Sequence, residues 1–406
     1  MMFERLNEVK VLRDPVHGYI HIDLKVIWDV LNSAWFQRLR RIRQLGGAVV
    51  VYHCAEHTRF EHSLGVYEIV RRMVTEVPDL SRELNEKEKV TAELAAMLHD
   101  IGHGPYSHAF EGVTNTSHEV YTCRIIEENT EITKILEDAC PGLSKDVADV
   151  IRHESSNPIL SQLISSQLDA DRFDYLIRDA YFTGTKYGEF DMERILRTMR
   201  VDNGRLAVKE SGVYAVENYI MARYHMYWQV YYHPVARSYE CVLHMLFKRL
   251  KDLGTRKLDP SVIPLFIPII KGQKIPLHTY FDLDEYACAY GFAQLVHHKD
   301  PITADLARRI RDRDLFEYAD STPSFNRKMR STLKKAGYDL NYYWGRNEVE
   351  QNPYKPYSGE FSGSIWVRMK DGSTRELSNA SNIVYSLIHG PTNDDNKVFF
   401  PDLKKK

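Results

Sequence analysis

Hydrophobic residues recur at three- and four-residue spacing through most of the first 200 positions, which is the period of an amphipathic helix. Ile27, Val30 and Leu31 illustrate the pattern in the first such segment. The helix over 87–100 should end where Gly102, Gly104 and Pro105 make continuation costly. The pattern predicts helices over 23–45, 60–77, 87–100, 118–138, 145–153, 159–180 and 191–199.

The pattern changes near residue 199, where two β-like runs flank Asn203-Gly204 and predict a hairpin. A long aromatic helix over about 214–252 follows. Prolines 260, 264, 268 and 276 then indicate a boundary, beyond which we expect helices around 282–297, 301–317 and 324–336, and a second hairpin at Ser364–Leu377. The predicted fold is mainly α, with a helical core and hairpin in residues 1–255 and a smaller mixed α/β region in 256–406.

Composition narrows the class of protein. The 406 residues are 43% hydrophobic and 27% charged, with a net charge of −2, so a general polyanion binder is excluded and nucleic acid is an unexpected partner. Five scattered cysteines without a CxxC pair argue against a disulfide framework or a structural zinc site. The N-terminus has no signal-peptide core, and the apolar stretch 262–270 is short and broken by prolines. We therefore expect a cytoplasmic protein without a membrane span.

The densest cluster of polar side chains is LHDIGHGPYSHAFE, residues 98–111. His103 lies four residues after His99, within reach of the same side of a helix, and Asp100 can reach a metal along the flank. Gly102 and Gly104 allow the close backbone approach that a phosphate-bearing ligand needs. Histidines that merely cap helix carbonyls are the alternative, but three histidines and two carboxylates within fourteen residues favour chemistry.

Further candidate ligands come from other predicted helices. His62 begins one of them, and the segment 168–179 carries Asp169, Asp171, Asp174 and Asp179 among apolar neighbours. A carboxylate in such surroundings is costly unless it is paired or bound to a metal. Asp169 and Asp174 are interpreted as salt-bridge partners of Arg172 or Arg178, which leaves Asp171 as the candidate ligand.

The order His62, His99-Asp100, Asp171 resembles the four-ligand signature of the HD-domain metal-dependent phosphohydrolases. Within that superfamily the surrounding motifs resemble the deoxynucleoside triphosphate (dNTP) triphosphohydrolase branch, which includes the human SAM-and-HD-domain enzyme. The motifs are DPVHGYI (14–20), FQRLRRIRQLGG (36–47), HTRFEHSLGVYE (57–68), HDIGHGPYSHAFE (99–111) and DADRFDYLIRDAYFTG (169–184). The resemblance runs from about residue 10 to 250, and the SAM domain has no counterpart in this sequence.

The resemblance implies hydrolysis of a dNTP to a deoxynucleoside and inorganic triphosphate, with a divalent metal (Mg, Mn, Fe, Zn or Ni) as cofactor. The implied metal ligands are His62, His99, Asp100 and Asp171, two imidazoles and two carboxylates. The implied catalytic groups are the general acid His108, His103 against the α-phosphate, and the supporting pair Glu111 and His118. Glu111 stands where the human enzyme has Asp.

The resemblance also assigns substrate contacts. The implied phosphate-binding residues are Arg59, Arg172, Arg223 and Tyr175. The residues implied to bind the 3′-hydroxyl are Gln44 and Asp179. Tyr231, with Leu45, would crowd a 2′-hydroxyl. Because residues 223–240 are aromatic throughout, a plain core role for Tyr231 is the alternative.

The family is activated by nucleotides bound between subunits of a dimer of dimers, so the resemblance implies a nucleotide activator and a homo-oligomer. The matching positions are Lys10, Val11, Asn32, Gln37, Arg40 and Arg194. Asn32 replaces a guanine-selecting Asp, and an amide cannot accept from both guanine N–H donors as a carboxylate does. Ordinary surface arginines are the alternative for Arg40 and Arg194. Alternative functions are another HD phosphohydrolase, or a nucleotide sensor or single-strand nucleic-acid binder.

Overall fold

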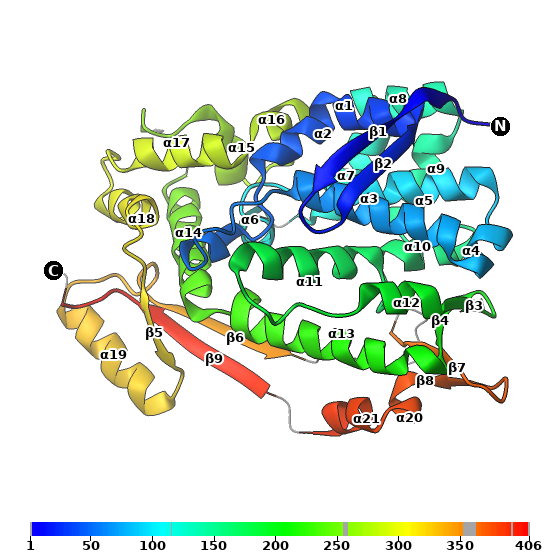
Figure 1. Ribbon diagram of the computed structural model, residues 1–406. Helices are drawn as coiled ribbons and strands as arrows, with labels where there is room; N and C mark the ends of the chain where they lie inside the picture. Colours follow the sequence, from blue (N-terminus) through cyan, green and yellow to red (C-terminus); the bar gives the residue numbers. More distant parts are fainter. Residues whose placement is uncertain (1, 115, 255–258, 352–362, 391–392, 405–406) are drawn as a thin grey trace.

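The computed structural model describes residues 2–114, 116–254, 259–351, 363–390 and 393–404 (Figure 1). It confirms a mainly α fold. The helices before residue 255 are α1 (Lys25–Asn32), α2 (Ala34–Arg38), α3 (Arg59–Glu76), α4 (Pro78–Glu83), α5 (Glu86–Leu98), α6 (His108–Thr114), α7 (His118–Glu127), α8 (Glu131–Ala139), α9 (Leu143–Ile151), α10 (Pro158–Ile164), α11 (Ala170–Thr183), α12 (Met192–Thr198), α13 (Val213–Met226) and α14 (Pro234–Leu253). Those after it are α15 (Ile267–Ile270), α16 (Leu277–Asp282), α17 (Glu285–Leu295), α18 (Pro301–Arg311), α19 (Pro323–Lys335), α20 (Leu377–Ala380) and α21 (Asn382–His389).

Three small antiparallel or mixed sheets flank the helices. The first is the hairpin β1 (Arg5–Asp14) and β2 (Gly18–Leu24). The second has the order β3 (Met199–Asp202), β4 (Arg205–Lys209), β7 (Trp366–Arg368) and β8 (Thr374–Glu376), and the third has the order β5 (Glu317–Asp320), β9 (Asn393–Phe400) and β6 (Gly345–Gln351). Both predicted hairpins are present as β3–β4 and β7–β8, and β7 pairs parallel to β4.

Several predicted helices are divided at residues with a clear local reason. Ser33 separates α1 from α2, and its side chain accepts a hydrogen bond from the Phe36 N–H as an N-cap. Asn129 takes a positive φ of 55° between α7 and α8, and Asp169 caps α11 after an irregular stretch. The predicted helices 23–45, 118–138 and 159–180 were therefore wrong as continuous elements. The spacing of hydrophobic residues continues across a capping residue and gives no sign of the interruption.

The predicted aromatic helix 214–252 is also divided. After α13 the chain widens into a π-turn over Tyr227–Tyr231, where the Tyr232 N–H donates to the Tyr227 carbonyl at 2.8 Å. Pro234 then begins α14, since proline lacks an N–H and fits the first turn of a helix. The π-turn matters because it displaces Tyr231 from the regular helical position.

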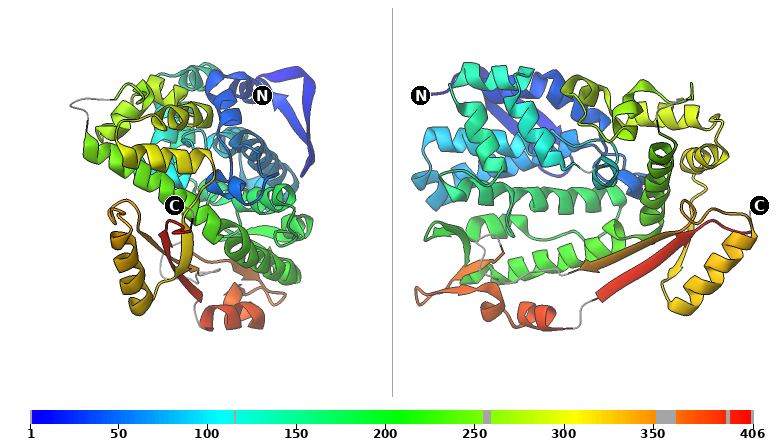
Figure 2. Two further views of the ribbon diagram at one scale, coloured as in Figure 1. Left: turned by 90° about the vertical axis from the view of Figure 1, so that its left-hand side faces the viewer. Right: turned by 180° about the vertical axis from the view of Figure 1, so that it is seen from behind.

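The N-terminal hairpin β1–β2 was not predicted. Its tip is closed by Asp14, whose Oδ1 accepts from the N–H groups of Val16 and His17 at 2.9 Å each. The hairpin lies along the outside of the helical core beside α1 (Figure 2). This arrangement brings His17 at the tip toward the interior, where it contacts α11.

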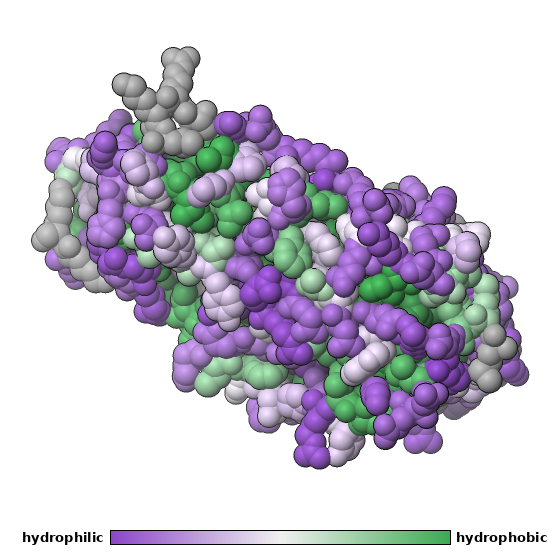
Figure 3. All heavy atoms as spheres, turned by 90° about the horizontal axis from the view of Figure 1, so that it is seen from above, coloured by the Kyte–Doolittle hydropathy of each residue, from purple (hydrophilic) through white to green (hydrophobic). Residues whose placement is uncertain are grey.

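A single large hydrophobic cluster contains residues from both sides of position 255, including Phe247, Phe266 and Phe292. The predicted boundary between residues 255 and 256 itself lies outside the described residues. The face seen from above carries hydrophobic side chains in patches separated by polar ones (Figure 3). Within the described part of the chain, no helix combines the length and apolarity needed to cross a membrane.

Candidate metal centre

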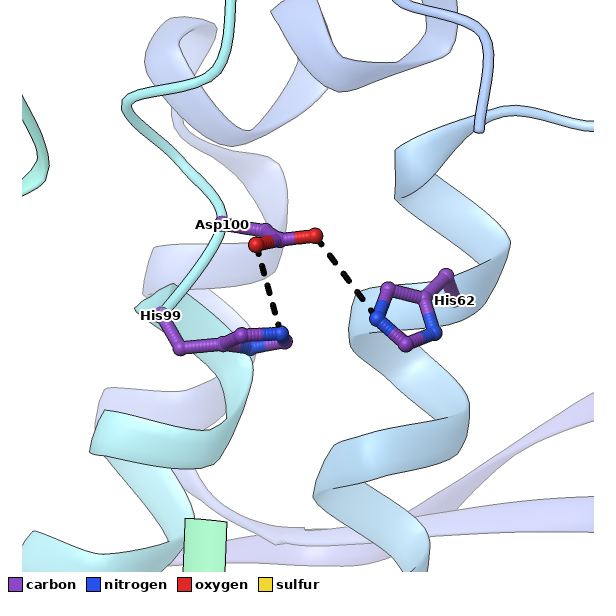
Figure 4. Close-up of side chains that lie close together, drawn as sticks. All are labelled: His62, His99 and Asp100. Atoms are coloured by element: carbon purple, nitrogen blue, oxygen red, sulfur yellow. Dashed lines mark ion pairs between the residues drawn. The ribbon is translucent and has the colours of Figure 1, made fainter. Parts of the chain in front are cut away.

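Four candidate metal ligands converge from three helices. His62 lies in the first turns of α3, His99 and Asp100 follow α5, and Asp171 lies in the first turn of α11. The His62 Nε2 lies 3.1 Å from Asp171 Oδ1 and 3.6 Å from Asp100 Oδ2, and the His99 Nε2 lies 3.4 Å from Asp100 Oδ1 and 3.7 Å from Asp171 Oδ1. Figure 4 shows His62, His99 and Asp100 pointing toward one another.

The two imidazoles are oriented as metal ligands are. The Nδ1 of His62 bonds to Asp174 Oδ2 at 2.8 Å, and the Nδ1 of His99 bonds to the Ala96 carbonyl at 2.8 Å. In the part of the chain that the structure describes, both buried Nε2 atoms lack a hydrogen bond of acceptable geometry. Ligand atoms of His62, His99 and Asp100 all lie within 4.8 Å of one another. Two imidazole nitrogens without a hydrogen bond beside two carboxylates fit a divalent cation, and Asp174 and the Ala96 carbonyl fix the orientation of the rings.

The charges of the cluster are strongly coupled. Burial opposes protonation of His62, but the carboxylates of Asp171 and Asp174 outweigh it and raise its pKa to about 10. Burial raises the pKa of the Asp100 and Asp171 carboxyls. Arg59, His99 and His103 nevertheless hold the pKa of Asp100 well below its usual range, and His62 and His99 lower that of Asp171. Without a cation, protonated imidazole therefore balances the carboxylates, and a bound cation would take over that role.

Behind His62, a buried network centres on Asp174. Its carboxylate bonds to His62, to the His17 Nε2 at 2.6 Å, and to the Arg178 guanidinium at 2.8 and 2.9 Å. Arg178 in turn donates to Asp14 at 2.9 Å. A Cβ on Gly65 would lie 1.8 Å from Asp174 Oδ1, so only glycine lets α3 approach α11 this closely.

The interpretation of Asp169 and Asp174 is confirmed, since each forms an ion pair on α11, with Arg172 and Arg178 respectively. The roles of His17 and Asp14 were not anticipated. Their motif DPVHGYI was noted, and a histidine three residues after a turn-forming Asp could have drawn attention to them. That signal does not identify a partner 157 residues away.

The loop after Asp100 winds tightly around the site. Gly102 has no room for a side chain, because a Cβ would lie 2.2 Å from the Thr122 N. Tyr106 and Ser107 adopt positive φ angles of 60° and 51°, a conformation that L side chains rarely adopt. Arg59 donates to both Asp100 and the Ser107 hydroxyl, the latter at 2.7 Å, and so ties the loop to the ligand carboxylate.

The structure brings three of the predicted catalytic groups together. Glu111 Oε1 lies 2.6 Å from the His118 Nδ1, and the His118 ring stacks on His103 with centroids 3.8 Å apart. The His103 Nε2 lies 3.3 Å from Asp100 Oδ1. Burial and the neighbouring Arg59 charge hold the pKa of His103 well below its usual range, so its imidazole is neutral at pH 7. His108 begins α6, and its side chain lies outside the described residues.

The predicted phosphate-binding side chains lie around α11. Arg172 follows the candidate ligand Asp171, and its guanidinium contacts Asp169 and the Ser166 carbonyl. Arg223 donates to Gln167 Oε1 at 2.7 Å. The Tyr175 hydroxyl lies 3.5 Å from that of Tyr227.

Two of the predicted sugar-binding side chains, Asp179 and Tyr231, contact each other directly. The Asp179 carboxylate accepts from the Tyr231 hydroxyl at 2.8 Å and contacts the His57 Nε2 at 2.8 Å. The Tyr231 ring packs edge-on against Tyr175, which joins this group to the phosphate-binding side chains. The buried Gln44 Oε1 lacks a hydrogen-bond partner among the described residues, and Leu45 packs partly buried against the core. His57 belongs to a noted motif, but its role was missed.

The predicted activator positions are distributed over five elements, β1, α1, α2, η1 (Leu39–Arg41) and α12. Lys10 and Val11 lie on β1, with Lys10 paired to Glu8, whereas Arg194 lies on α12 and donates to the Ser211 carbonyl. The others lie between α1 and η1, where Gln37 accepts from Arg40, and the Asn32 amide donates to Trp28.

Comparison with known proteins places these residues in a broader context. The HD domain family matches residues 59–179, and the family described as HD associated region matches 190–261. The chain is 45% identical over 98% of its length to the uncharacterized protein YwfO of Bacillus subtilis, covering 93% of that protein. It is 29% identical to the deoxynucleoside triphosphate triphosphohydrolase SAMHD1 homolog of Dictyostelium discoideum, over 58% of this chain and 48% of that protein. A crystal structure of a phosphohydrolase from Bacteroides thetaiotaomicron superposes with a TM-score of 0.85 at 28% identity, covering 97% of this chain and 100% of that one.

Proposed function

Because this chain belongs to the HD-domain family of phosphohydrolases, we propose that it is a metal-dependent dNTP triphosphohydrolase that releases a deoxynucleoside and inorganic triphosphate. The named activity of the Dictyostelium relative and the five shared motifs support this substrate. Cytoplasmic dNTP pools are the setting in which we expect it to act.

The observation that carries the proposal is the combination of a metal quartet with cationic side chains beside it. Arg59 contacts the ligand Asp100 directly, and Arg172 adjoins the ligand Asp171. Arg223 lies across from α11 on α13. A triphosphate carries several negative charges and needs such guanidinium donors, whereas a monophosphate or cyclic nucleotide does not.

The chain's own residues account for most of the steps. A divalent cation held by the quartet supplies Lewis-acid activation of a phosphoryl oxygen and of water. Neutral His103 donates a hydrogen bond toward the α-phosphate without adding charge. The Glu111–His118 pair fixes His103 by stacking, and His108 protonates the 5′-oxygen, which is otherwise a poor leaving group.

The sugar is held at the opposite end of the phosphate-binding group. Asp179, fixed by His57 and Tyr231, accepts from the 3′-hydroxyl, and Gln44 offers its unpaired Oε1 there. The Tyr231 ring occupies the space that a 2′-hydroxyl would need, with Leu45 beside it. Deoxyribose is therefore favoured over ribose, because a buried hydroxyl without a partner is costly.

Regulation follows the same proposal. A second nucleotide binds near Lys10, Val11, Asn32, Gln37 and Arg40, with Arg194 at a further position, and promotes a homo-oligomer built as a dimer of dimers. The Asn32 amide already donates to Trp28, so we expect an activator without strict guanine selectivity.

Product analysis tests the proposal. Metal-reconstituted protein is incubated with each dNTP alone and with a mixture, and the nucleosides and phosphates are separated by anion exchange. Deoxynucleoside with intact triphosphate supports the proposal, whereas orthophosphate or pyrophosphate would assign the chain to another HD phosphohydrolase. The Asp171→Ala variant is the control for contaminating phosphatases and should be inactive.

A further inference from the structure

The loop that carries His99, Asp100 and His103 rests on a segment from far along the chain. This segment, Tyr280–Glu285, runs from the end of α16 to the first residue of α17. It lies after residue 261, the last residue that the HD associated region family matches. The Tyr280 hydroxyl donates to the Gly102 carbonyl at 2.7 Å, and its ring stacks on Tyr121 of α7 with centroids 3.8 Å apart. Tyr280 is 2% exposed, so this hydrogen bond is shielded from water.

A buried arginine makes the second connection. The Arg38 guanidinium, 0% exposed, donates to the His103 carbonyl at 2.8 Å and to the carbonyls of Phe281 and Leu283 at 3.1 and 2.8 Å. One planar guanidinium group therefore joins the backbone of the loop at His103 to the backbone of the distant segment. The Arg38 guanidinium also lies over the Tyr280 ring, 5.0 Å from its centroid.

The third connection passes through Glu285. Its carboxylate accepts from the backbone N–H and the Nη1 of Arg43, each at 3.0 Å, and from the Tyr106 N–H at 3.4 Å. Tyr106 and Ser107 are the two loop residues with positive φ, and Ser107 is the residue that Arg59 holds beside Asp100. Glu285 thus supports the part of the loop whose backbone conformation is least favourable on its own.

From these contacts we infer that Tyr280 and Glu285, with Arg38, are positioning residues that hold the loop Asp100–Ser107 in its ligand-binding geometry. None of the three residues is among the candidate metal or substrate ligands, so the segment acts through the loop. The inference deepens the proposed function, on which its kinetic part rests, and gives residues after 256 an indirect part in the reaction, through the loop. It also explains why residues 280–285, which lie outside the two segments that the family models match, pack against the site.

The test compares two single-hydroxyl deletions in the full chain. Tyr280→Phe removes the bond to Gly102 and keeps the ring stack. Tyr343→Phe is the matched control, because Tyr343 is similarly buried and donates to Asp305, away from the loop. For Tyr280→Phe we expect kcat to fall about tenfold or more, as for other outer-shell partners, with KM changed less than about twofold. Hydrogen exchange in a peptide covering 99–107 should become faster in Tyr280→Phe and stay unchanged in the Tyr343→Phe control.

Glu285→Gln provides a second, independent variant. The amide –NH2 group of Gln would face N–H donors of Arg43 or Tyr106, so at least one of their hydrogen bonds would be lost. This variant should accelerate exchange in the same peptide and lower metal affinity. Unchanged exchange and kcat in both variants would overturn the inference, as would an equal loss in the Tyr343→Phe control. Exchange and metal binding need no substrate, so wild-type protein that releases no triphosphate would refute the proposed function and leave this test intact.

Discussion

Replacement of Asp174 by Asn should weaken metal binding without removing any metal ligand. The Asp174 carboxylate is fully buried and accepts four hydrogen bonds, from His17, His62 and two nitrogens of Arg178. An Asn side chain has one acceptor oxygen, so two of these donors would face an amide N–H₂ group. Breaking one partner of a buried ion pair costs about 3–5 kcal/mol, and loss of an outer-shell partner costs about 10–100-fold in metal affinity.

The two effects are measured separately. Urea unfolding in the presence of a chelator gives the free energy of unfolding of the metal-free protein, and calorimetric titration with Mn²⁺ gives the affinity. Asp300→Asn is the control, since this half-buried carboxylate pairs with Arg249 away from the quartet and should reduce stability alone. An Asp174→Asn protein that binds Mn²⁺ as tightly as wild type would refute the positioning role of Asp174 behind His62.

Three further predictions concern pH, phosphate binding and sugar selection. The pKa of His62 is about 10 in the metal-free protein against an ordinary value of 6.5, so its contribution to stability is complete below pH 6.5 and is lost as pH rises toward 10. Metal binding must displace that proton, so the Mn²⁺ affinity should rise about tenfold per pH unit between pH 7 and 9, and a pH-independent affinity would contradict this. Arg172→Ala and Arg223→Ala should each lower kcat/KM for dATP roughly 10–150-fold, the range for a lost charged hydrogen bond, whereas unchanged steady-state kinetics would exclude a phosphate contact. Tyr231→Ala should narrow the preference for dATP over ATP by about tenfold or more, measured as the ratio of kcat/KM values, and an unchanged ratio would assign Tyr231 to the core.

Local sequence patterns were sufficient for much of the fold. The turn pair Asn203-Gly204 located one hairpin, because its residues suit the backbone that a tight turn requires, and the second was predicted within Ser364–Leu377. Helix interruptions at Ser33 and Asp169 were missed, since a capping side chain acts through one hydrogen bond and leaves the hydrophobic period intact.

The site shows a similar division. The metal quartet was proposed from motifs and stays a prediction, whereas the ion pairs of Asp169 and Asp174 followed from the cost of burying a charge. The contacts of His17 with Asp174 and of Tyr280 with Gly102 could not be foreseen, because each joins residues more than 150 positions apart. Such contacts depend on tertiary packing, and no local period or spacing encodes them.

Hydrolysis in ¹⁸O-labelled water tests the central claim most directly. Wild-type protein with Mn²⁺ is incubated with dATP, the products are separated, and their masses are measured by mass spectrometry. Attack at the α-phosphorus with release of the 5′-oxygen predicts one ¹⁸O atom in inorganic triphosphate and none in deoxyadenosine. Label in orthophosphate or in deoxyadenosine monophosphate would show cleavage at another bond and contradict the account.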